Sequence, residues 1–202
     1  MARYPSVSKI LNEWIKFRIG NVEYAMNIIS GSVIPASRLD AKAGMGKAIH
    51  KVAELYFKGT LDESKLHPSL IHPLQQIKLW EAEHKIVVID TEKDLVSEKY
   101  KFTGRRDIKG RTNGDLFICD VKSTFIEGVT TGPQTAAYEI LDREWSDDEE
   151  LRRRFVLMID PNGEKKYEFR EKVDPKDVTY FHAALFRYNY IEANKFTRKY
   201  GN

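Results

Sequence analysis

Residues 114–124, GDLFICDVKST, combine the pattern of a buried strand with two charged side chains. The apolar residues from Leu116 to Cys119, together with Val121, are typical of a strand covered on both faces of its sheet. Asp120 and Lys122 are two residues apart, so a strand places both on the same face. Burying a carboxylate and an ammonium costs free energy unless they meet a partner, an ion or a substrate. Asp120 and Lys122 are therefore candidates for chemistry.

The hairpin before this strand brings a second carboxylate to the same place. Asn113-Gly114 is a strong signal for a two-residue hairpin loop. With these residues in the loop, Asp107 lies directly opposite Asp120, with Cβ atoms about 5 Å apart. Two carboxylates this close repel by about 4 kcal/mol at an effective dielectric near 20. The alternatives are a bound divalent cation, or a buried Asp120–Lys122 or Asp107–Arg ion pair without chemistry.

These residues resemble the PD-(D/E)XK nuclease superfamily, in which an Asp precedes a short hairpin and Asp/Glu-X-Lys follows on a core strand. Asp107 and Asp120-Val121-Lys122 hold those places in this chain. The segment EKDLVSEKYKFTGRRD resembles the approach to the motif Asp in mitochondrial genome maintenance exonuclease and its phage relatives. YPSVSKIL, near the start, resembles the opening of small phage nucleases of this type.

More narrowly, the chain is similar to the RecB-like exonuclease branch of that superfamily. GKAIHKVAELY carries His50 in a Gly-x-x-x-His setting, and QTAAYEIL carries Gln134 and Tyr138 as Gln-x-x-x-Tyr. The resemblance covers roughly two thirds of the chain, from Tyr4 to about Tyr138. Some RecB-like nucleases hold an iron–sulfur cluster on four cysteines. Because this chain has only Cys119, no iron–sulfur cluster is expected.

The resemblance implies a metal-dependent mechanism. Asp107, Asp120 and the Val121 carbonyl would bind one or two Mg²⁺ or Mn²⁺ ions, and His50 would add a nitrogen ligand that makes Mn²⁺ more acceptable. The ions would polarise the scissile phosphate and activate a water molecule. Lys122 would orient or activate that water and offset charge in the transition state.

Two further pairs of residues are expected near this site. Glu92 and Glu98 are six residues apart and share a face of a regular strand, and the pattern leaves open which one reaches the metal or holds Lys122. Gln134 and Tyr138 are one helical turn apart and share a helix face. Their expected roles are to bind DNA near the cleaved phosphate and to support Lys122.

Basic residues flank the motif Asp. Arg105 and Arg106 alternate across the strand beside Asp107, so at most one of them faces the site. With Lys109 or Arg111, that arginine is expected to bind the DNA backbone without reading its sequence. The alternative for these residues is ordinary solvated surface.

Composition places the chain among globular proteins. It has 202 residues, a net charge of +3 and 42% hydrophobic residues, which suits one domain with a proper core. No apolar run approaches the roughly 20 residues of a membrane helix, and the N-terminus lacks the layout of a secretory signal. We therefore expect an intracellular protein without a membrane partner, cytoplasmic in a bacterial host if a phage encodes it.

Periodicity predicts the elements that position these residues. Helices are expected from Ser6 or Ser8 to about Arg18, and over residues 36–58, 73–84, 133–145 and 175–196. Strands are expected over residues 86–90, 94–101, 102–108 and 115–123, with a hairpin over 154–170. This order predicts a mixed α/β (α+β) domain. The resemblance implies a restriction-endonuclease-like core with a central mixed sheet flanked by helices.

The expected organisation is one nuclease domain, with helices in residues 1–85 that carry His50, a core in 86–145, and a hairpin and helix in 150–200. The leading hypothesis is a metal-dependent DNA exonuclease in phage or accessory recombination and repair. The alternatives are a structure-specific endonuclease and a non-cleaving DNA-binding or assembly module. The family resemblance implies a recombinase or a single-strand annealing protein as a partner.

Overall fold

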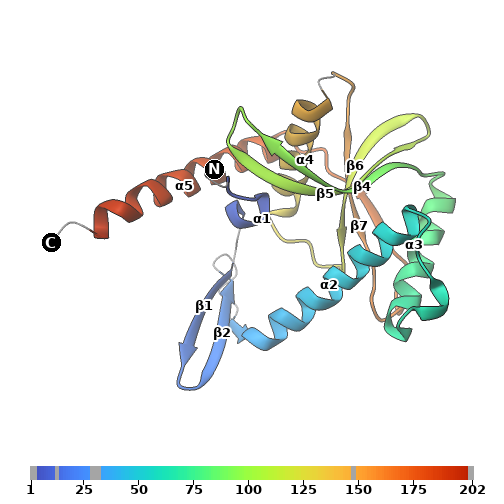
Figure 1. Cartoon of the computed structure of the whole chain (residues 1–202), viewed down its shortest axis with the longest axis horizontal. Coiled ribbons are helices and arrows are strands. Elements are labelled where there is room, and N and C mark those ends of the chain that lie inside the picture. Colours follow the sequence, from blue (N-terminus) through green and yellow to red (C-terminus); the bar gives the residue numbers. More distant parts are fainter. Residues whose placement is uncertain (1–3, 12–13, 28–32, 147–148, 200–202) are drawn as a thin grey trace.

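The structure is a computed structural model that describes residues 4–11, 14–27, 33–146 and 149–199. A five-stranded sheet forms its centre, and helices cover both faces of that sheet (Figure 1). A separate three-stranded sheet lies in the N-terminal part of the chain. The predicted mixed α+β architecture, with a central mixed sheet flanked by helices, is confirmed.

The central sheet contains strands that run in sequence order from one edge to the other. They are β4 (Val87–Ser97), β5 (Phe102–Thr112), β6 (Asp115–Lys122), β7 (Arg153–Met158) and β8 (Glu168–Glu171). Neighbouring strands are antiparallel except β6 and β7, which are parallel. A parallel pair needs a crossover connection, and α4 (Thr131–Ser146) provides it.

Two hydrophobic cores lie on opposite faces of this sheet. On one face, α2 (Ala36–Phe57) and α3 (Ile71–Glu83) pack around Trp80. On the other face, α1 (Val7–Ile10), α4 and α5 (Lys176–Lys199) pack around Phe102. Two short 3-10 helices, Glu63–Lys65 and Pro68–Leu70, connect α2 to α3.

Strand β6 contributes to both cores, as its apolar sequence predicted. Phe117, Cys119 and Val121 belong to the core under α2 and α3, whereas Ile118 belongs to the core under α4 and α5. Each large apolar side chain buried in this way contributes about 1.5–3 kcal/mol. The middle of β6 is therefore fixed by packing on both faces, and the polar side chains Asp120 and Lys122 lie at its C-terminal end.

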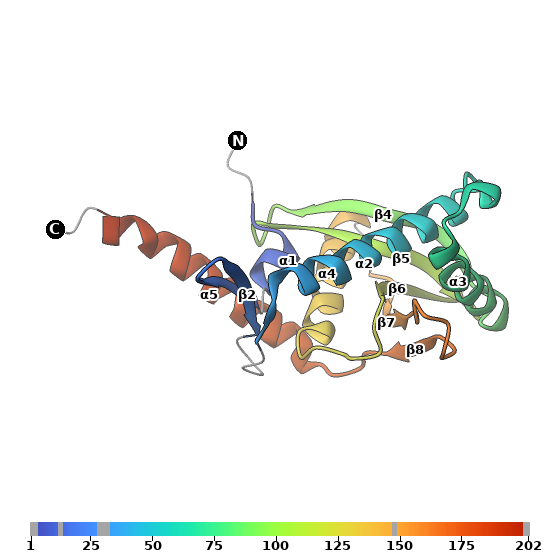
Figure 2. The same ribbon diagram turned by 90° about the horizontal axis from the view of Figure 1, so that it is seen from below.

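The C-terminal part of α5 extends past the central sheet, and both views show it projecting from the body (Figures 1 and 2). Among the described residues, none of the helices combines the length and apolarity required to cross a bilayer.

The β5–β6 hairpin forms as predicted. Asn113 and Gly114 have φ values of 51° and 93°, which are typical of the two central residues of a type I′ turn. The strands pair from Thr112–Asp115 to Ile108–Cys119. The next position in this register would join Asp107 to Asp120, but the pairing of β5 with β6 ends at Ile108–Cys119.

Two predicted elements are wrong in extent. Instead of two strands over residues 86–90 and 94–101, β4 is one continuous strand, with a register irregularity between Val88 and Asp90. Glu92, in the middle of β4, has a φ of 50°, so the strand changes direction locally without ending.

The first predicted helix is also much shorter than expected. Ser6 caps α1, as predicted, but α1 ends at Ile10. Strands β1 (Trp14–Ile19), β2 (Val22–Asn27) and β3 (Val33–Pro35) follow, and they form the antiparallel three-stranded sheet. Apolar and basic residues alternate along β1 with the strand period of two, and this pattern outweighs the helical reading.

Candidate metal centre

Three side chains from three different elements converge at the open end of the central sheet. They are His50 of α2, Glu92 of β4 and Asp107 of β5, and one ligand atom from each lies within 4.8 Å of the others. The Nδ1 atom of His50 is 3.3 Å from Glu92 Oε1 and 3.4 Å from Asp107 Oδ1. Only a small part of each carboxylate is exposed. We call these residues the His–Glu–Asp triad.

Local backbone features place the triad. Gly46 lets α2 approach the end of β6, because a Cβ atom there would lie 3.3 Å from Ser123 Oγ. This contact gives a physical reason for the glycine of the Gly-x-x-x-His sequence. Glu92 reaches the triad from a left-handed backbone conformation, which costs about 1–3 kcal/mol in a non-glycine residue. Such strain is often concentrated at functional sites.

The side chain of Asp107 accepts a hydrogen bond from the backbone of β6, in place of a backbone hydrogen bond between β5 and β6. Its Oδ2 accepts a hydrogen bond of 2.7 Å from the Val121 backbone N–H, just beyond the last paired residues of β5 and β6. Its other oxygen remains directed at His50. The side chain of Asp107 therefore bridges β6 and the triad.

His50 carries the positive charge of the metal-free triad. Burial lowers the pKa of His50, but the charge and hydrogen bond of Asp107 and the hydrogen bond to Glu92 outweigh it and raise the pKa to about 11. With both ring nitrogens protonated, Nε2 donates to the Val121 carbonyl at 2.9 Å. The imidazolium thus partly neutralises the two carboxylates.

A second group of polar side chains adjoins the triad at the end of β6. Lys122 Nζ lies 2.9 Å from Asp120 Oδ2 and donates a hydrogen bond of 2.8 Å to Gln134 Oε1. The side-chain amide of Gln134 donates in turn to the Tyr138 hydroxyl at 3.0 Å. Burial raises the pKa of Asp120, although the charge of Lys122 opposes the shift, and burial raises that of Tyr138. We call these residues the Lys122 group.

The donor atoms of the triad fit a divalent cation. One imidazole nitrogen and two carboxylates suit Mn²⁺, and the carboxylates suit Mg²⁺. The Val121 carbonyl, expected as a ligand, accepts the hydrogen bond from the His50 ring in the metal-free site, an arrangement that commonly orients metal-binding histidines. Asp120, also expected as a ligand, faces Lys122 and lies outside the triad.

The two candidate glutamates have different positions. Glu92 belongs to the triad, whereas Glu98 lies beyond the end of β4, where it accepts from the Tyr4 hydroxyl at 2.9 Å and pairs with Lys101 at 3.1 Å. The expectation that both share one strand face fails because β4 ends at Ser97, so Glu98 lies outside the strand that carries Glu92. The structure therefore favours Glu92 as the glutamate of the site.

Of the two adjacent arginines, Arg105 alone is accessible. Arg105 is exposed and forms two hydrogen bonds of 2.8 Å with Asp94, and Glu92 contributes to the raised pKa of its guanidinium. Arg106, expected as a candidate for backbone binding, is only 1% exposed and contacts Asp142 and Asp90. Arg106 is therefore a core ion-pair residue and cannot present its guanidinium to DNA in this conformation.

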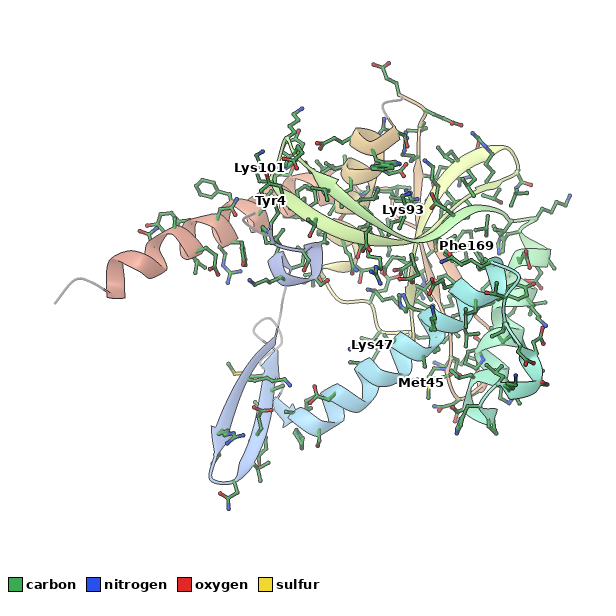
Figure 3. The ribbon with its side chains drawn as sticks, viewed as in Figure 1. Tyr4, Met45, Lys47, Lys93, Lys101 and Phe169 are labelled. Carbon is green, nitrogen blue, oxygen red and sulfur yellow. The ribbon has the colours of Figure 1, made fainter. Side chains whose placement is uncertain are left out.

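The other two basic candidates also have protein partners. Lys109 is mostly buried and lies 2.9 Å from Asp142, while Arg111 pairs with Glu150 at 2.6 Å near the hairpin turn. Neither side chain points to the triad. Lys47, three residues before His50 on α2, is exposed (Figure 3).

Comparisons with known proteins leave the family open. No protein-family model matches the chain, and no curated protein matches it. One solved structure that it resembles is from Eubacterium rectale and is described as a "Putative exonuclease". The TM-score is 0.46 at 12% identity, over 73% of this chain and 66% of that one, so this chain spans slightly less than two thirds of that protein. A likeness this distant assigns neither a family nor an activity.

Proposed function

We propose that the protein is a divalent-metal-dependent nuclease that hydrolyses phosphodiester bonds in DNA and degrades the DNA from its ends. The observation that carries the proposal is the convergence of the His–Glu–Asp triad and the Lys122 group on one end of the sheet. Residues scattered from His50 to Tyr138 meet there, and the sequence resemblance to PD-(D/E)XK nucleases rests on nearly the same set.

The triad would hold one Mg²⁺ or Mn²⁺ ion through His50, Glu92 and Asp107. When bound, such an ion polarises a phosphate and lowers the pKa of a water molecule beside it. Asp120 lies next to the triad, and its carboxylate could complete a second position if Lys122 moved toward the substrate. The contribution of the chain itself is to keep three charged ligands in place before the substrate arrives.

Lys122 would act on the reacting atoms. Lys122 Nζ lies 2.9 Å from Asp120 Oδ2, and its hydrogen bond to Gln134 fixes the direction of its side chain. An ammonium in this place orients the attacking water and offsets negative charge on the phosphate as the bond to the leaving oxygen breaks. The attacking water loses a proton to solvent, and the leaving oxygen takes one from solvent.

The proposal is tested by the products formed from three DNA substrates with Mg²⁺ or Mn²⁺. End-labelled linear duplex and single strands should be shortened progressively, while covalently closed circular DNA should remain intact. Cleavage of the closed circle would make the protein an endonuclease. Tight DNA binding without turnover, with either metal, would make it a non-cleaving module.

A recombinase or a single-strand annealing protein is proposed as a partner on the sequence resemblance alone. Co-purification of such a protein with the tagged chain from its native host, before and after nuclease treatment, would test this interaction.

A further inference from the structure

A groove beside the N-terminal segment has no role in the metal centre. Its volume is about 620 Å³, and its walls come from the segment before α1, from α1, from the start of β5 and from α5. Residues that line it include Tyr4, Ser6, Lys9, Thr103, Tyr188 and Asn189. We call it the N-terminal groove. Its size is that of a pocket for a small molecule or for one or two nucleotides.

The walls of the groove are tied firmly to the body of the protein. The backbone N–H of Thr103 donates to the Pro5 carbonyl at 2.9 Å, and Ser6 forms a parallel bridge with Thr103. Beneath them, Val7 packs into the core that contains Phe181 of α5. The groove is therefore built from fixed elements, although the chain segment that forms one wall precedes the first helix.

Two tyrosines and Lys9 line the groove, and Lys101 lies beside it, next to Tyr4. Lys9 Nζ is 5.4 Å from the centre of the Tyr188 ring, and Lys101 Nζ is 5.3 Å from that of Tyr4. Tyr4 and Lys101 lie together at the end of the β4–β5 pair (Figure 3). Aromatic faces on which bases stack, combined with cations that follow the backbone, are the usual chemistry of single-stranded nucleic-acid binding.

Strand β5 contributes to both the groove and the candidate site. Thr103 precedes Asp107 by four residues on β5, a distance of about 13 Å along a strand. Between them, a Cβ atom on Gly104 would lie 2.7 Å from Leu141, 3.0 Å from Tyr138 and 3.1 Å from Val7, so the core under α4 and α5 packs closely against this part of β5. At the rise of about 3.4 Å per nucleotide in a stacked strand, this distance corresponds to about four nucleotides.

We propose that the N-terminal groove binds a single-stranded segment of the DNA, a few nucleotides from the bond that the metal centre hydrolyses. This inference rests on the proposed nuclease function. It gives Tyr4, Ser6 and Lys9 of the YPSVSKIL sequence a role that the metal centre does not require. Stacking supplies most of the binding, because Glu192 in the groove and Glu98 at its rim partly balance the lysines.

The test is the affinity of a fluorescently labelled oligo-dT strand, measured by anisotropy with Ca²⁺ in place of Mg²⁺ or Mn²⁺. Tyr188→Ala should weaken binding about tenfold, since one base–aromatic stack contributes about 1–3 kcal/mol. Tyr188→Phe, which keeps the ring, should bind within about twofold of wild type. Tyr190→Ala is the matched control, because Tyr190 lies on the same helix, is 64% exposed and does not line the groove.

Tyr4→Ala provides a second test from the opposite wall and should weaken binding by a similar factor. Wild-type affinity in both Tyr188→Ala and Tyr4→Ala would overturn the inference, as would equal losses in Tyr190→Ala. A blunt duplex that binds as tightly as oligo-dT, with the same dependence on Tyr188, would overturn the single-strand assignment.

The same experiment separates this inference from the nuclease proposal. Loss of cleavage in Glu92→Gln, together with oligo-dT binding that does not depend on either tyrosine, would support the nuclease proposal and refute DNA binding by the N-terminal groove. Oligo-dT binding that depends on both tyrosines, in a protein that cleaves no DNA with any metal, would support DNA binding by the N-terminal groove and refute the nuclease proposal.

Discussion

Glu92 Oε1 lies 3.3 Å from His50 Nδ1, although 42 residues separate the two in the sequence. The contact joins the middle of strand β4 to helix α2, and it depends on the left-handed backbone of Glu92. A second glutamate on the same segment, Glu98, lies outside the cluster. This difference between two glutamates six residues apart provides a matched test of the metal centre.

Glu92→Gln should remove a charged ligand while preserving the size of the side chain. We expect DNA hydrolysis to fall at least about 100-fold, as when a group that stabilises developing charge is lost. The dissociation constant for Mn²⁺, measured by electron paramagnetic resonance, should rise at least about tenfold. Glu98→Gln should leave both quantities within about twofold of wild type. Equal effects of the two substitutions would contradict the assignment.

Metal binding should release a proton from His50. In the metal-free protein the pKa of His50 is raised to about 11, so at pH 7–8 the ring is protonated and must lose a proton to bind a cation. The apparent affinity for Mn²⁺ should therefore increase with pH. Titration calorimetry in buffers of different ionisation enthalpy should give about one proton released per ion. His50→Gln should release none from this position.

Protonation of His50 should also affect the stability of the metal-free protein. Its stabilising contribution should decrease as pH rises, whereas the apparent metal affinity increases. The folded pKa of His50 lies above its usual value of 6.5, so its stabilising contribution is complete below pH 6.5 and is lost as pH rises toward 11. The difference in unfolding free energy between wild type and His50→Gln should thus narrow between pH 6.5 and 9. A difference that widens over this range, measured by urea denaturation in EDTA, would contradict the charge state assigned to His50.

Gln134→Ala should misplace Lys122 without removing it. The hydrogen bond of 2.8 Å from Lys122 to Gln134 is lost, while the contact with Asp120 remains. We expect kcat to fall about tenfold with little change in KM, because the effect concerns orientation more than binding. Gln75→Ala, at an exposed position of α3, is the control and should leave both kcat and KM unchanged. A change confined to KM would assign Gln134 to DNA binding instead.

Asp142→Ala should destabilise the fold without reaching the metal centre. Asp142 is fully buried and meets Arg106, Lys109 and Arg152, so its removal leaves buried positive charges uncompensated. The expected loss of unfolding free energy is about 3–5 kcal/mol in urea denaturation. Asp94→Ala breaks only an exposed pair with Arg105 and should cost less than about 1 kcal/mol. Similar losses in both variants would refute the buried network.

The sequence predicted the elements whose signals are local. The apolar run of β6 indicated burial on both faces, and Asn113-Gly114 indicated the hairpin and its register, because turn geometry and side-chain period act over a few residues. The N-terminal sheet was missed because a capping serine near an apolar run also fits a helix. The alternation of side chains along β1 was the competing local signal, and tertiary packing decided between them.

The sequence by itself determined that Asp107, Asp120 and Lys122 lie near the end of a core strand, and the family resemblance added His50. Only the tertiary structure decided their partners. Asp107 turns to a backbone N–H and to His50, Glu92 groups with His50 and Asp107 while Asp120 pairs with Lys122, and Arg106 meets Asp142 in the core. These outcomes depend on where the strands and the two separately packed helices α2 and α4 bring charges together, and no local pattern encodes distances between elements so far apart in the chain.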